Sequence, residues 1–134
     1  LKLRTENGIT IIDDAFNSNP VGARNAVDIL GEIEGGQRFI VTPGMVEMGA
    51  HEDTANYELG LHIAKSATDA VHLVGDAQTQ ALQRGLKEGG FPHDCIHVHD
   101  TLFDAQDTLS TRLQPGDIVL YENDLPDQYE PVAA

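Results

Sequence analysis

Two acids and two amides stand close together early in the chain, and their side chains could hold a ligand. Asp13 and Asp14 end an apolar run, and Asn17 and Asn19 follow within a few residues. Carboxylate oxygens accept hydrogen bonds and amides both donate and accept them, so this set suits a polar ligand that carries hydroxyl groups. The same residue types also form turns and cap helices, so a well-capped loop without a ligand is an equal alternative.

The residues around this cluster predict a strand, a turn and a helix. A strand is predicted over residues 8–14 from its β-branched apolar side chains, Ile9, Ile11 and Ile12. Asn19 suits an N-cap and Pro20 suits the first helical turn, and apolar side chains then recur at helical spacing up to residue 34. In open α/β sheets, ligands bind at the edge where such strands end.

The rest of the chain continues this alternation. Further strands are predicted over residues 39–41, 70–74, 95–98 and 117–121, with helices beginning near His51, Ala77 and Asp100 or Thr101. A short first strand, residues 1–6, leads into the hairpin signal Asn7-Gly8, and Gly35-Gly36 is expected to cap the first helix. The sequence therefore predicts one α/β domain over residues 1–134. Its expected architecture is a Rossmann-like three-layer sandwich, with a mainly parallel sheet of about six strands and helices on both faces.

Charge and composition limit the partners of the chain. There are 22 acidic and 8 basic residues, for a formal charge of −14. Such a surface repels nucleic acid and anionic membranes, so neither is expected as a partner, and an ATP site here would need cations from elsewhere. Cys95 is the single cysteine, which fits a reducing, cytoplasmic compartment, and no apolar run is long enough to span a membrane. The chain opens on Leu1 and is expected to be a fragment of a longer protein.

Several kinds of catalytic site are missing from the sequence. Gly44 and Gly49 have the glycine spacing of a phosphate loop, but Ala50-His51 follows where the loop needs Lys and a hydroxyl. Neither a Gly-x-Gly-x-x-Gly motif nor a Gly-x-Ser-x-Gly elbow occurs. The sequence therefore does not predict a self-contained ATPase or hydrolase.

A metal site is also not expected. His97 and His99 lie two residues apart on a predicted strand, with His93 and Cys95 nearby. A zinc site needs three or four ligands, and no second pair is spaced to complete one. The alternative is that these are partly exposed histidines of an edge strand.

The first polar cluster resembles the start of the C-terminal domain of Mur ligases. That family carries an Asp-Asp-x-Tyr-Asn-Ala-Asn-Pro pattern, and residues 11–20 read IIDDAFNSNP, with Phe16 for the Tyr and Ser18 for the Ala. Residues 42–49, TPGMVEMG, are similar to the family's Gly-Asp-Met-x-Glu-Leu-Gly block, and residues 115–120, PGDIVL, match its closing strand. The three motifs occur in the family's order, and the match is nearest to the MurF branch.

The resemblance implies an ATP-dependent amide ligase of peptidoglycan precursor synthesis. Such a ligase converts the carboxylate of a UDP-MurNAc-peptide into an acyl phosphate, and an amino acid or a dipeptide such as D-Ala-D-Ala attacks it. An N-terminal domain would bind the UDP end, and a central domain would carry the phosphate loop and most of the Mg²⁺ ligands. The fragment alone is expected to be inactive and monomeric.

The resemblance also assigns roles to residues, and it places no catalytic residue on this domain. The residues expected at ATP are Asp14, on the ribose, Asn17 and Asn19. The residues expected at the other substrates are Asn17, Asn19, Pro20, Thr42, Glu47 and Met48. Glu47 could instead only stabilise the start of the next helix.

One segment departs from the family. The closing strand is followed by Glu122-Asn123-Asp124, which is acidic where MurF proteins have a Lys-Gly-Ser type of turn. This departure leaves the acceptor substrate open. It also keeps open a related ligase of the folylpolyglutamate or cyanophycin synthetase type, although the Asn-Ser-Asn-Pro loop argues against that type. A separate interpretation is a nucleotide-binding or interaction module without catalysis.

Overall fold

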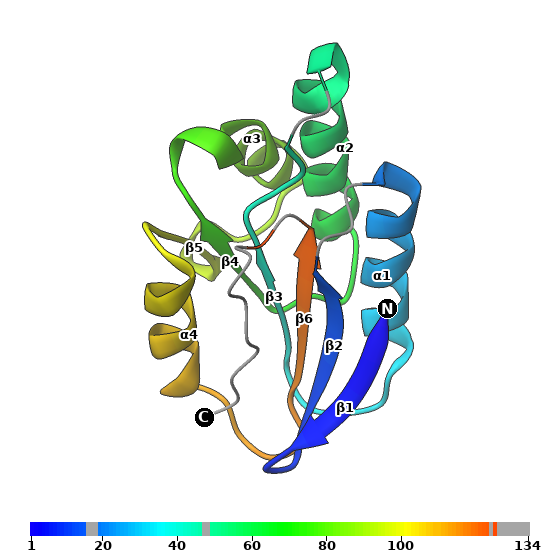
Figure 1. The fold of residues 1–134 in the computed structure, drawn as a ribbon, viewed down its shortest axis with the longest axis vertical. Coiled ribbons are helices and arrows are strands. Elements are labelled where there is room, and N and C mark those ends of the chain that lie inside the picture. The colour runs from blue at the N-terminus through cyan, green and yellow to red at the C-terminus, as the bar shows by residue number, and fades with distance from the viewer. Residues whose placement is uncertain (16–18, 47–48, 124, 126–134) are drawn as a thin grey trace.

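A six-stranded sheet forms the centre of the molecule, in the order β1-β2-β6-β3-β4-β5 (Figure 1). The computed structural model describes residues 1–15, 19–46, 49–123 and 125. The strands are β1 (Lys2–Glu6), β2 (Ile9–Ala15), β3 (Arg38–Thr42), β4 (Ala70–Val74), β5 (Ile96–His99) and β6 (Ile118–Asn123). Each neighbouring pair is parallel except β1 and β2, which confirms the mainly parallel sheet predicted from the sequence.

Four α-helices are described, and they cover the two faces of the sheet unequally. The helices are α1 (Pro20–Glu32), α2 (Glu52–Ala64), α3 (Gln80–Glu88) and α4 (Leu102–Ser110), and the 3-10 turns are η1 (Gly49–His51), η2 (Ala77–Thr79) and η3 (His93–Cys95). Helices α1, α2 and α3 pack on one face, and α4 packs on the other (Figure 1). Right-handed crossovers explain this division, because β2, β3, β4 and β5 advance in one direction across the sheet and the chain then returns to β6.

Each face of the sheet has its own apolar core. The core under α1, α2 and α3 takes side chains from alternate strand positions, including Ile12, Ile40 and Leu120. The core under α4 takes the intervening positions, including Ile11, Val41 and Val119. Both faces of the central strands are therefore covered, which is why these strands read as nearly continuous apolar runs. Among the described residues, no helix is long and apolar enough to cross a membrane.

The hairpin turn was predicted correctly, and the glycine pair after α1 was not. Asn7 and Gly8 have φ values of 52° and 81°, as a type I′ turn requires. Gly35 and Gly36 are absent from the left-handed region, and α1 ends instead at Ile33 in an extended conformation. The glycines are needed for space: a Cβ on Gly35 would lie 2.5 Å from the carbonyl oxygen of Gly116.

Several strand boundaries also differ by one or two residues from those predicted, and two of these differences have a clear structural cause. The fifth strand starts at Ile96, one residue late, because Cys95 ends the η3 turn. The last strand does not stop at Tyr121 but continues to Asn123. Strand β6 lies between β2 and β3. Its pairing with β3 ends at Tyr121, but its pairing with β2 continues through the polar residues Glu122 and Asn123.

Candidate functional site at the carboxyl edge of the sheet

The predicted site lies where β2, β6 and β3 end side by side. Asp14 of β2 is in register with Glu122 of β6, and Thr42 ends β3 on the other side of β6. Strand residues alternate between faces, so Asp14 and Glu122 share the face of Ile12 and Leu120, under α1, α2 and α3. Only 7% of the surface of Asp14 is exposed. Glu122, which was not assigned to the site from the sequence, therefore lies beside Asp14.

Asp13 and Asp14 differ in the way that strand alternation predicts. Asp13 is half-buried, and its Oδ1 accepts a hydrogen bond from the backbone N–H of Ala15 at 3.2 Å. It stabilises the end of its own strand, whereas Asp14 lies beside Glu122. The two adjacent acids therefore have separate roles.

Asn19 and Pro20 begin α1 beside this edge, as predicted. The Asn19 side-chain oxygen accepts hydrogen bonds from the backbone N–H groups of Val21 at 2.9 Å and Gly22 at 3.3 Å, and Pro20 is the first helical residue. The Asn19 oxygen therefore caps α1. Asn17 lies outside the described residues.

Thr42 joins β3 to the end of β6. Its hydroxyl donates to Oδ1 of Asn123 at 2.8 Å and accepts from the backbone N–H of Gly44 at 3.0 Å. Thr42 and Asn123 are both fully buried, and Asn123 has the left-handed φ of 74° that usually favours glycine. Thr42 lies at the predicted edge, but its described contacts hold the ends of β3 and β6 together.

Asn56 of α2 fixes the loop that leaves β3, and the sequence analysis missed it. Its side-chain oxygen accepts from the N–H of Met45 at 2.8 Å, and its amide donates to the carbonyls of Met45 at 2.7 Å and Glu52 at 2.9 Å. A polar residue beside Ala55 on an otherwise apolar helix face was the signal available. Glu47 and Met48, which follow in this loop, lie outside the described residues.

Glu122 is the unusual group of the site. Its side chain is fully buried, and neither carboxyl oxygen has a hydrogen-bond partner within the described part of the chain. Burial, and then the negative charge of Asp14, raise the pKa of Glu122 well above its ordinary value. A buried acid of this kind beside a ligand-binding edge is a candidate functional residue.

The same edge is hollowed further along, between β4 and β5. A hollow of about 400 Å³ lies there, lined by Pro43, Val74, Gly75, Gln78, Asp100, Thr101 and Leu102. The chain leaves β4 toward α3 on one face and leaves β5 toward α4 on the other. Ligands of open α/β sheets bind at such a change of direction, so the hollow extends the candidate site along the edge.

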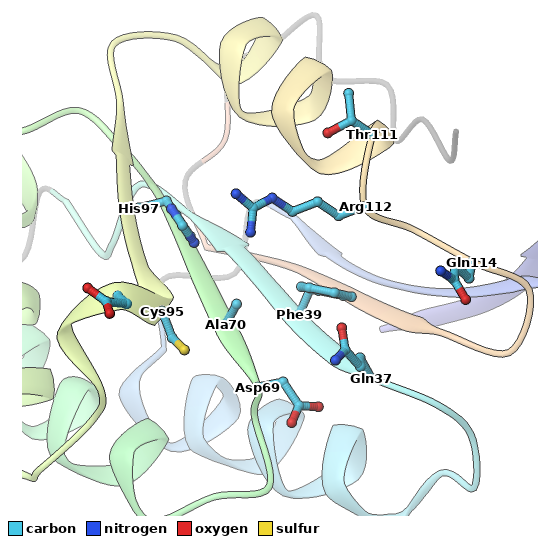
Figure 2. A pocket seen from close by; sticks show the side chains of 10 residues that line it. Gln37, Phe39, Asp69, Ala70, Cys95, His97, Thr111, Arg112 and Gln114 are labelled. Carbon is cyan, nitrogen blue, oxygen red and sulfur yellow. The ribbon is translucent and has the colours of Figure 1, made fainter.

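A second cavity, of about 420 Å³, lies at the opposite edge, among the segments that lead into β3, β4 and β5. Figure 2 shows the Arg112 side chain reaching from the end of α4 toward His97, with Phe39 below. Asp69 and Asp94 also line this cavity, so its charge does not suit phosphate groups. It is separate from the predicted site.

Three histidines form a cluster on the α4 face of the sheet. Nδ1 of His72 lies 3.0 Å from Nε2 of His99, and the His72 ring stacks on His97 at 4.7 Å between centroids. Burial, followed by the charges of His97, His99 and Arg112, lowers the pKa of His72 to about 3, and burial also lowers the pKa values of His97 and His99. The sequence analysis overlooked His72, which lies in the apolar strand β4. Within the described ranges, no group of three or more His, Cys, Asp or Glu residues could hold a metal ion.

Comparison with known families decides the wider assignment. A family model described as "Mur ligase, glutamate ligase domain" matches residues 1–121 of the 134. The chain belongs to this family. The match confirms the resemblance carried by the three sequence motifs.

Curated relatives place the chain near one branch of the family. It is 26% identical over 121 residues, 90% of its length, to the UDP-N-acetylmuramoyl-tripeptide--D-alanyl-D-alanine ligase of Bacillus subtilis. It is 29% identical over 129 aligned residues to the Mycobacterium leprae protein of the same name. The chain spans 26% and 25% of the lengths of these relatives, so it corresponds to about a quarter of each.

Solved structures support the fold. The MurF ligase of Thermotoga maritima in complex with ADP superposes with a TM-score of 0.73 at 22% identity, over 91% of this chain and 26% of that one. A MurF structure from Acinetobacter baumannii gives 0.75 at 21% identity, over 93% of this chain and 27% of that one. The Rossmann-like α/β architecture predicted from the sequence is confirmed.

Proposed function

We propose that this chain is the C-terminal domain of a MurF-like, ATP-dependent amide ligase of peptidoglycan precursor synthesis. The observation that carries the proposal is the position of Asp14, near the carboxyl end of β2, which pairs in parallel with β6, and within the family's first motif. The names of the curated relatives and the ADP in the Thermotoga maritima complex support it. An N-terminal domain and a central domain would complete the enzyme.

The residues present fit one end of ATP. The Asp14 carboxylate has two oxygens that can accept hydrogen bonds from both ribose hydroxyls. Asn17 and Asn19 belong to the loop that would face the nucleotide, and the backbone of the Asn19 turn leads into the amino end of α1. The sequence has no phosphate loop, so the phosphates and Mg²⁺ would be held mainly by the central domain.

The reaction would proceed in two steps, in which the carboxylate is first phosphorylated and the amine then displaces the phosphate. The carboxylate of a UDP-MurNAc-peptide attacks the terminal phosphate of ATP, which releases ADP and leaves an acyl phosphate. The amine of an amino acid or a D-Ala-D-Ala-like dipeptide then attacks the acyl carbon, an amide bond forms, and inorganic phosphate leaves. Pro20, Thr42, Glu47 and Met48 lie in the segments that would face the acceptor.

The chain would act by closing over these substrates. Domain closure brings the reactants together and excludes the water that would hydrolyse an acyl phosphate. The contribution of this chain is therefore positioning, and the bond-breaking groups are the substrates themselves. This explains why the site is rich in hydrogen-bonding groups but contains no evident nucleophile.

The test uses the full-length protein that contains this chain. We expect ADP release that depends on both a UDP-MurNAc-peptide and D-Ala-D-Ala, with the amide product detected by mass spectrometry. The purified chain alone should neither hydrolyse ATP nor form product. Glutamate addition to a folate substrate would instead favour the folylpolyglutamate synthetase interpretation, and nucleotide binding without turnover would favour a binding module.

A further inference from the structure

We propose that Glu122 is a positioning residue for Asp14: the two carboxyl groups hold one negative charge between them, and Glu122 carries the proton. This inference rests on the proposed function for its role in ATP binding, but the state of the pair is a separate property. It begins from the register of two parallel strands, in which Asp14 of β2 lies directly opposite Glu122 of β6.

The surroundings of the pair favour a single charge. Both side chains lie on the face covered by α1, α2 and α3, with 7% of Asp14 and none of Glu122 exposed. Two carboxylates this close in a dry setting repel each other, so one of them keeps its proton. Glu122 is the more buried member, and its pKa is raised by burial and by Asp14.

Within the described part of the chain, no positive charge is recorded as acting on Glu122. On the β3 side, the Thr42 hydroxyl is already bonded to Asn123 and Gly44. The backbone nitrogen of Leu1, which precedes β1, lies 3.8 Å from Oδ1 of Asp14, so any positive charge there acts on Asp14. The Glu122 oxygens have no hydrogen-bond partner among the described residues. A neutral carboxylic acid is the form that this environment tolerates.

The arrangement has a direct consequence for the nucleotide. While Glu122 is neutral, Asp14 keeps its charge and its place at the end of β2, where it can accept hydrogen bonds. When rising pH removes the Glu122 proton, the second charge repels Asp14 and disturbs the ribose contact. The Michaelis constant for ATP should therefore rise with pH over the titration of Glu122.

The first test follows the titration of both groups by NMR, with ¹³C labels on the carboxyl carbons of Asp and Glu. The sample has an acetylated amino terminus, so that the Leu1 nitrogen carries no charge. Glu122→Gln identifies the Glu122 signal by its loss. We expect that signal to remain in the protonated position at pH 7 and to titrate at lower pH in Asp14→Asn, because the neighbouring charge is gone.

Asp13→Asn is the matched control, because Asp13 is adjacent in sequence but bonds the backbone of Ala15. It should leave the Glu122 midpoint unchanged. A Glu122 signal that titrates in the ordinary range of glutamate, or a midpoint that is the same in Asp14→Asn, would overturn the proposal. If Asp14→Asn does not fold, the reverse measurement decides the coupling: the titration midpoint of Asp14 is compared between the wild type and Glu122→Gln.

The second test measures ATP kinetics of the full-length protein across the pH range in which NMR shows Glu122 to titrate. The wild-type Michaelis constant for ATP should rise over the Glu122 titration, while that of Glu122→Gln should stay flat, with kcat similar in both. A wild-type constant that does not change with pH would refute the positioning role even if NMR shows a shared charge. A failure of Asp14→Ala to affect ATP would instead refute the proposed function, and the NMR coupling would still decide the state of the pair.

Discussion

The carboxyl pair at the end of β2 and β6 and the histidine cluster of β4 and β5 show two ways of burying ionisable groups in one sheet. Glu122 and His72 are both fully buried. Among the described residues, the two carboxyl oxygens of Glu122 and Nε2 of His72 have no hydrogen-bond partner. Burial is the largest cause of both pKa changes, and it acts in opposite directions because it disfavours charge in each case.

The two regions differ in what surrounds them. Nδ1 of His72 shares a hydrogen bond with His99, and the His72 ring stacks on His97, so neutral imidazoles meet part of the hydrogen-bonding need of His72. Glu122 is in register with another acid at the carboxyl edge of the sheet, and its oxygens have no hydrogen-bond partner among the residues that the structure describes. The comparison indicates that the histidines are a stable packing solution, whereas the acid is retained at a cost to stability.

The largest effect expected is the loss of stability at acid pH that the histidines cause. Their pKa values are lowered in the folded chain, so their stabilisation is present above about pH 6.5 and is lost as the pH falls below it. For His72, protonation of the unfolded chain alone costs about 1.4 kcal/mol per pH unit below that value. Urea unfolding at pH 7.5 and pH 5 measures this loss.

The histidine prediction has a close control. His72→Phe should flatten the acid side of the stability curve, since it removes the most strongly shifted group. His93→Gln, at the exposed start of η3, should leave the curve as it is. Equal acid sensitivity in the wild type and His72→Phe would mean that the cluster is not the cause.

Glu122 should have the opposite effect on the pH dependence of stability, because its contribution is lost as the pH rises. Its pKa is raised in the folded chain, so the protonated acid contributes fully below about pH 4.3, the ordinary value, and that contribution is lost as the pH rises through the folded pKa. The melting temperature of Glu122→Gln should therefore equal that of the wild type near pH 4 and exceed it at pH 8. Thermal melts across this range measure the difference, and a variant less stable at pH 8 would contradict the expectation.

Asp14→Ala should weaken ATP binding in the full-length protein. A lost charge-assisted hydrogen bond costs about 1.5–3 kcal/mol, which corresponds to about a 10- to 100-fold rise in the Michaelis constant for ATP if ground and transition states use the contact alike. Asp13→Ala should affect ATP less and folding more, because its carboxylate bonds the N–H of Ala15. Steady-state kinetics and melts of both variants test this, and greater damage to ATP kinetics in Asp13→Ala would reverse the assignment.

Thr42→Val should show how firmly β3 holds the end of β6. The variant keeps the shape of the side chain but leaves Oδ1 of Asn123 and the N–H of Gly44 without the hydroxyl. Loss of a buried partner costs about 1–3 kcal/mol. Thr68→Val is the control variant, because Thr68 is half-buried and its hydroxyl shares a hydrogen bond with Ser66. The denaturation midpoint of Thr68→Val should fall less than that of Thr42→Val.

Local patterns were enough to predict most of the fold. Alternating strands and helices indicated the parallel sheet, and Asn19-Pro20 correctly marked the start of α1. The end of β6 was predicted wrongly, because Glu122 and Asn123 are poor strand formers by themselves and become strand residues through their neighbours in the sheet. Pairing between distant segments supplies this information, and a single sequence does not contain it in readable form.

The candidate site was predictable to a similar degree. Strand alternation predicted that only one of Asp13 and Asp14 faces the sheet edge in a given direction, and the family resemblance named Asp14. The partners of Asp14 and Thr42 could not be chosen, because Glu122 and Asn123 lie far along the chain and meet them only through strand order. His72 was overlooked for the same reason, since its polar neighbours come from β5.

The smallest effect expected is that of zinc, which should leave the histidine cluster unchanged. His72 and His99 already bond each other, and stacked rings at 4.7 and 5.2 Å do not converge on a common point as tetrahedral ligands must. A metal would have to break the His72–His99 bond and bring a further ligand into a buried strand pair. Addition of zinc and then a chelator should therefore leave the melting temperature within error, whereas stoichiometric zinc with a melting temperature that falls on chelation would show a metal site.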